Sequence, residues 1–224
     1  MKNWLIKPHP YQTKVEEFFN ALTHAAGMGL SVAALVLLTV FASMQHSMVK
    51  VLSCMLFGCS LIAMYTASTM YHTTTDARLK HFFKIVDHTT IYGLIAGSYT
   101  PVVLVILSGV WGWTLFSLVW GLALLGFVFK VFFIGRFEAL SVSIYIGMGW
   151  LAIVAIDPLW QALAPGGLAW LFAGGLSYTG GVIFYSMNRV RFAHMLWHLC
   201  VLGGSICHFF FVLLYVIPAP MIKS

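Results

Sequence analysis

Seven long apolar runs, separated by short polar breaks, constrain this chain more than any other feature of its sequence. A helix that spans a membrane needs about 20 mostly apolar residues. Only 8% of the residues are charged, whereas soluble domains carry about 25%. We therefore predict an all-α fold, a bundle of seven transmembrane helices. The expected spans are residues 21–43, 51–72, 86–107, 112–134, 139–157, 168–187 and 193–217.

Little sequence lies outside these spans. We predict a cytoplasmic N-terminal segment (1–20), a membrane domain (21–217) and a short outer tail (218–224). The N-terminal segment is longer and more polar than the charged start of a signal peptide. The first apolar run is therefore expected to be an uncleaved span.

Lysine and arginine are distributed unevenly between the two ends of such a bundle. Of the 12 basic residues, ten fall in the N-terminal segment and in the breaks after the second, fourth and sixth spans. Lys50 and Lys223 alone fall on the other side. Because basic loops stay in the cytoplasm, we predict a cytoplasmic N-terminus and an outer C-terminus. The net charge of +6 is then a signal of topology, and we expect no nucleic-acid partner.

Three histidines are predicted to meet at the inner end of the bundle. His72 ends the second span there, and His194 and His198 begin the seventh. Residues four apart share one face of a helix, so His194 and His198 can present two ring nitrogens to one point. Ionisable groups inside a membrane are costly and face the bundle interior.

The three imidazoles predict a zinc site with an open position. Three histidines plus one water are the ligand set of zinc in metal-dependent hydrolysis. Asp87, expected at the inner start of the third span, could hold or deprotonate that water. Ser68, one turn from His72, could donate a hydrogen bond to a substrate carbonyl.

Each of these residues also has a structural interpretation. Membrane histidines often only form hydrogen bonds between helices, and His72 could contact lipid headgroups. Asp87 could cap the third helix or pair with Lys84. Ser68 could bond to its own backbone.

Further polar residues are expected along the interior. His208 lies ten residues after His198, about 15 Å along a helix axis, so it is too far away to share a metal with that residue. By helical periodicity it faces the same interior cavity as His194. We also assign Ser98 and His24 to the lining of this cavity.

Several segments together carry a family resemblance. They are "VEEFFNALTHAAG", "ASTMYH", "KIVDHTTIYGLIAGSYTP" and "HMLWHLCVLGGSICHF". They resemble the haemolysin III proteins, the bacterial branch of the progestin and adipoQ receptor family, which is related to adiponectin receptors and alkaline ceramidases. The resemblance covers nearly the whole chain and implies seven helices with the N-terminus inside.

The resemblance also implies a site and an activity. It implies zinc held by His72, His194 and His198, with Asp87 on the metal-bound water and Ser68 nearby. It further implies a multi-pass protein of the bacterial cytoplasmic membrane that acts on membrane lipids, as a hydrolase of a lipid amide or ester.

Three classes of function remain open at this stage. They are a zinc-dependent hydrolase with a role in membrane homeostasis, a lipid sensor with structural zinc, and a pore-forming haemolysin. A pore is the weakest of these, because few polar groups are expected through the outer half of the bundle.

Overall fold

A computed structural model describes residues 12–107, 109–187 and 189–220. Within these residues, seven helical spans are long and apolar enough to cross a membrane. The predicted all-α, seven-helix fold is confirmed. The outermost predicted segments, with Lys2, Lys7 and Lys223, lie outside the described residues in whole or in part.

The helices have the following bounds. The first three are α1 (Lys14–Ser43), α2 (Met48–Thr73) and α3 (Ala77–Pro101), which continues as the π-helical turn η1 (Val102–Leu107). After α4 (Gly109–Phe133), the fifth span consists of α5 (Glu138–Gly149), η2 (Leu151–Ala155) and α6 (Ile156–Ala162). The last two spans are α7 (Pro165–Ser186) and α8 (Ala193–Phe211), which ends in η3 (Val212–Val216).

Two helices begin well before their predicted starts. α1 starts at Lys14 rather than at residue 21, because Thr13 and Glu16 form a capping box: Oγ1 of Thr13 accepts from the Glu16 amide, and the Glu16 carboxylate accepts from the Thr13 amide. α3 starts at Ala77 rather than at residue 86, because the Asp76 carboxylate accepts from two amides of the first turn. Both starts carry charged residues that suggested loops, yet a capped helix end tolerates such charges.

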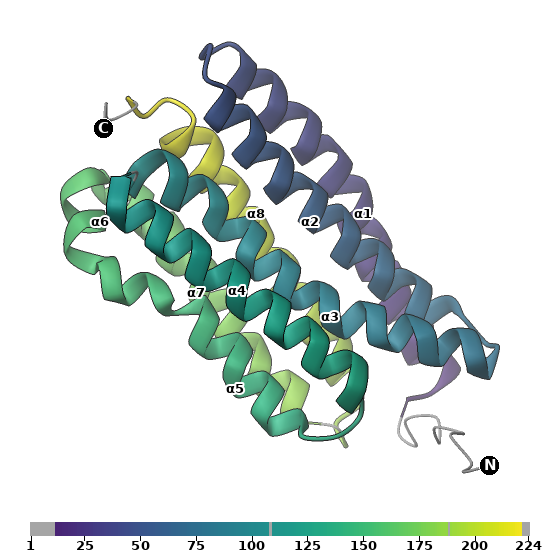
Figure 1. Cartoon of the computed structure of the whole chain (residues 1–224). Coiled ribbons are helices and arrows are strands. Elements are labelled where there is room, and N and C mark those ends of the chain that lie inside the picture. Colours follow the sequence, from purple (N-terminus) through teal and green to yellow (C-terminus); the bar gives the residue numbers. More distant parts are fainter. Residues whose placement is uncertain (1–11, 108, 188, 221–224) are drawn as a thin grey trace.

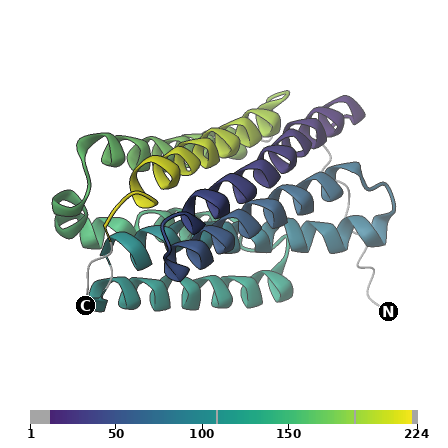
Figure 2. The ribbon, with the colours of Figure 1, turned by 90° about the horizontal axis from the view of Figure 1, so that it is seen from above.

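The helices form a bundle in which α3 is the most buried span (Figure 1). α1 lies between α2 and α8, α2 packs on α3, α3 on α4, and α7 on α8. The view from above shows α1 and α8 running along the same face of the bundle (Figure 2). This arrangement brings the N-terminal part of α1 next to the start of α8 and the end of α2.

Small residues set the close contacts between these helices. A Cβ atom at Gly97 of α3 would collide with Ser60 of α2, and one at Gly181 of α7 would lie 2.7 Å from Cys200 and Trp197 of α8. Without a hydrophobic driving force in lipid, such close approach supplies the packing energy.

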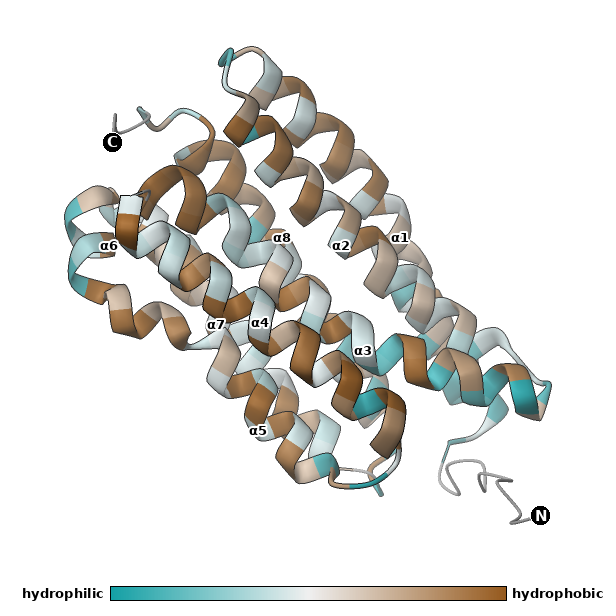
Figure 3. Ribbon diagram, in the orientation of Figure 1, coloured by the Kyte–Doolittle hydropathy of each residue, from teal (hydrophilic) through white to brown (hydrophobic). Residues whose placement is uncertain are grey.

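Charge collects at one end of the bundle. Figure 3 shows apolar colour along the helices and hydrophilic colour around the start of α3 and the α4–α5 connection. Across that connection, the buried Lys130 ammonium of α4 pairs with Glu138 of α5 at 2.9 Å. At the opposite end, Lys50 donates to the carbonyls of Ile217 and Ala219 at 2.7 and 2.6 Å, which satisfies backbone groups at the end of the last helix.

Candidate metal centre

The structure brings His72, His194 and His198 together. One possible ligand atom from each lies within 4.8 Å of the others. Their ring centroids are 4.6 to 5.1 Å apart. His72 comes from the last turn of α2, and the pair comes from the first turns of α8, which begins directly after Phe192 in the left-handed region (φ 60°).

Hydrogen bonds hold one ring nitrogen each of His72 and His198. Nδ1 of His72 lies 2.6 Å from Oε2 of Glu17, while Nε2 is buried without a hydrogen-bond partner. Nδ1 of His198 lies 3.1 Å from the Asn20 carbonyl oxygen. A buried ring nitrogen without a partner is costly, and a shared metal ion would satisfy it. Three convergent imidazoles therefore fit zinc by donor type and number.

The side chains that bond to these histidines come from α1, and sequence reasoning missed them. Glu17 contacts His72, and Thr23 Oγ1 lies 3.3 Å from Nδ1 of His198. His24, predicted only to line the cavity, does so and also stacks on His198, with centroids 3.5 Å apart and an angle of 12°. The sequence does contain a signal for these contacts: Glu17, Asn20 and His24 are spaced so that they share one polar face of a helix.

Asp87 and Ser68 lie along the same cavity as His194 and His198. The prediction that Asp87 opens its helix is wrong: it lies nearly three turns inside α3, and Asp76 is the cap. The Asp87 carboxylate is 3.8 Å from Nδ1 of His88. Ser68 Oγ is buried without a hydrogen-bond partner, so the alternative that it bonds to its own backbone is also wrong.

The cavity has a volume of about 440 Å³ and a mostly apolar lining. Its polar lining residues include Asn20, Lys84 and Glu138, together with His194 and His198. The apolar lining includes Leu94, Ile95, Val102, Leu159, Phe172 and Val201.

Ser98 and His208 line the cavity as well. The Ser98 hydroxyl donates to the Ile95 carbonyl at 2.9 Å. The His208 ring meets Tyr178 edge-on at 5.5 Å, and its Nε2 has no hydrogen-bond partner. His208 lies outside the three-histidine cluster.

Comparison with known proteins gives consistent matches over most of the chain. The family model described as "Haemolysin-III related" matches residues 12–209. The hemolysin-3 homolog of Bacillus subtilis (strain 168) is 45% identical over 93% of this chain and 98% of its own. Hemolysin-3 of Bacillus cereus is 45% identical over 91% of this chain and 93% of its own. The human monocyte to macrophage differentiation factor is 25% identical over 93% of this chain and 87% of its own.

Proposed function

The chain belongs to the haemolysin III family, and from this membership and the site geometry we propose that it is a zinc-dependent hydrolase of a membrane lipid amide or ester. One observation supports the proposal: three imidazoles converge in one cluster, and two of them, His194 and His198, line a cavity whose walls are mostly apolar. In this proposal an acyl chain occupies the apolar part of the cavity, and its polar linkage is held beside the histidines.

His72, His194 and His198 would hold the zinc ion. When bound, zinc supplies Lewis acidity toward a carbonyl oxygen and toward water. The described part of the chain offers three ligands in this cluster. A structural zinc site more often has four protein ligands, which favours a catalytic ion over a structural one.

The other cavity residues have separate tasks. The Asp87 carboxylate, which lines the same cavity as His194 and His198, would accept a proton from the attacking water and pass it to the leaving amine or alkoxide as the C–N or C–O bond breaks. Ser68 Oγ is free to donate a hydrogen bond to the carbonyl oxygen, where negative charge develops. The products are a fatty acid and the released amine or alcohol.

We further propose that the site faces the cytoplasm in a bacterial inner membrane. The excess of lysine and arginine at the histidine end of the bundle supports this orientation. Membrane lipids would enter from that leaflet, and the role that follows is control of lipid composition.

Two other functions compete with the hydrolase. The names of the Bacillus relatives suggest haemolysis, but a conducting pore needs polar walls, and the lining of this cavity is mostly apolar. A lipid sensor needs the same cavity without chemistry, so it differs from the enzyme only in turnover.

The test is release of fatty acid from mixed membrane lipids by the purified protein. The proposal expects release that a chelator abolishes and added zinc restores. A folded, zinc-loaded protein that releases no fatty acid from any lipid amide or ester would favour the sensor.

A further inference from the structure

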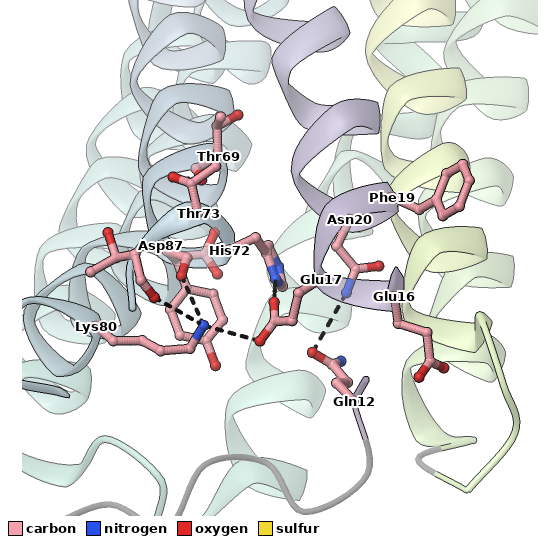
Figure 4. A network of polar contacts seen from close by, with 12 residues as sticks. Gln12, Glu16, Glu17, Phe19, Asn20, Thr69, His72, Thr73, Lys80 and Asp87 are labelled. Carbon is pink, nitrogen blue, oxygen red and sulfur yellow. Dashed lines mark hydrogen bonds and ion pairs between the residues drawn. The ribbon is translucent and has the colours of Figure 1, made fainter. Parts of the chain in front are cut away.

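Glu17 bridges three helices beside the histidine cluster (Figure 4). Its Oε2 lies 2.6 Å from Nδ1 of His72, and its Oε1 accepts from the Lys80 ammonium at 3.0 Å. Lys80 also donates to the carbonyls of Tyr71 and Thr74 at the end of α2. The His72 side chain is fully buried, whereas Glu17 is 22% exposed.

These contacts decide where the His72 ring carries its proton. A carboxylate oxygen only accepts hydrogen bonds, so the proton of the short contact belongs to Nδ1 of His72. In the neutral ring, Nε2 then keeps its lone pair. Nε2 is also the buried nitrogen that has no partner, so it is the one left to bind a ligand.

An acceptor also faces Nδ1 of His198, and here it is a backbone carbonyl. This Nδ1 lies 3.1 Å from the carbonyl oxygen of Asn20, which also only accepts. One face of α1 therefore bonds to the Nδ1 side of a ring from α2 and of a ring from α8.

We propose that Glu17, held in place by Lys80, is a positioning residue that fixes the tautomer and orientation of His72. The proposal rests on the proposed function in that His72 is taken as a metal ligand. A carboxylate behind a ligating histidine orients the ring and raises its basicity. The ion pair with Lys80 keeps the Glu17 carboxylate directed at Nδ1, so the affinity for metal depends on two residues that do not touch the metal.

The first test is a zinc titration of the full chain in detergent, in competition with a chromophoric chelator. Glu17→Ala should lower zinc affinity by about 10- to 100-fold, the usual effect of losing such a partner. Glu17→Gln should lower it less, because the amide oxygen still accepts from Nδ1.

Asp76→Asn is the matched control. It removes one carboxylate from the same end of the bundle and keeps a good helix cap, so its zinc affinity should stay within about twofold of the wild type. A Glu17→Ala protein that is folded and binds zinc as tightly as this control would overturn the inference.

The second test needs no metal. Nitrogen NMR of the histidine side chains in metal-free protein should show His72 as the Nδ1–H tautomer, assigned by the signal that is lost in His72→Gln. Glu17→Ala should shift that signal toward the other tautomer, whereas a merely structural role would leave it unchanged. If the wild type binds no zinc, the proposed function fails, and this measurement still decides the positioning role.

Discussion

Two adjacent glycines of α7 give a paired test of how helix packing supports the site. A Cβ atom at Gly181 would lie 2.7 Å from Cβ of Cys200 and from the Trp197 ring, whereas one at Gly180 meets nothing within 4 Å. Ordinary contacts between carbon atoms are about 3.5–4.0 Å. Gly181→Ala therefore requires α8 or the Trp197 ring to move by about 1 Å.

The two substitutions should differ in their effect on the free energy of unfolding. Both substitutions gain about 0.8–1.0 kcal/mol of helix propensity, because alanine replaces glycine in a helix. Only Gly181→Ala adds overpacking, which costs about 1–3 kcal/mol. The free energy of unfolding of Gly181→Ala should thus lie about 1–3 kcal/mol below that of Gly180→Ala.

The same displacement should reach the candidate metal centre. Trp197 and Cys200 flank His198 in the chain, so a shift of α8 moves that ring relative to His72. Gly181→Ala should weaken zinc binding, and Gly180→Ala should not. Unfolding in detergent and a zinc competition titration measure both effects, and equal behaviour of the two variants in both assays would refute the reasoning.

Three further predictions concern the site and its surroundings. Asp87→Asn should keep zinc, since all three imidazoles remain, but it should lower turnover by about 10² to 10⁴. An assay of lipid hydrolysis measures this effect, with Asp157→Asn, at an exposed position, as the control. An Asp87→Asn protein with wild-type turnover would exclude Asp87 as the base. Lys50→Met removes two charged hydrogen bonds at the far end and should lower the free energy of unfolding by about 1.5–3 kcal/mol, with the zinc affinity unchanged. In a cysteine-free background, Arg189→Cys should resist an impermeant thiol reagent in intact cells while Gln45→Cys reacts, and the reverse result would place the site outside.

The sequence was sufficient for the seven spans, because in lipid the length and apolar character of a helix are set by the bilayer itself. It was also sufficient to predict that His72 lies near His194 and His198. Because successive helices alternate in direction, the end of the second span and the start of the seventh lie on the same side of the membrane. The polar starts of α1 and α3 were not predicted to be helical, because hydropathy alone does not distinguish charged residues in a capped first turn from loop residues.

The partners of the histidines could not be found from spacing between the predicted ligands alone. Glu17 lies outside the first predicted span, and its contact with His72 depends on how α1 rotates against α2. That rotation is set by close contacts such as Tyr65 against Gly27, which only the packed structure reveals. Likewise, the position of Asp87 well inside α3 follows from the Asp76 cap.

We propose that His72, His194 and His198 together hold one zinc ion. Elemental analysis of purified protein should find about one zinc per chain in the wild type, the stoichiometry of a single three-histidine site. His194→Ala should lose it. His208→Gln should retain it, because His208 lies on the same helix but outside the cluster. Equal zinc in all three proteins, or none in the wild type, would contradict the account.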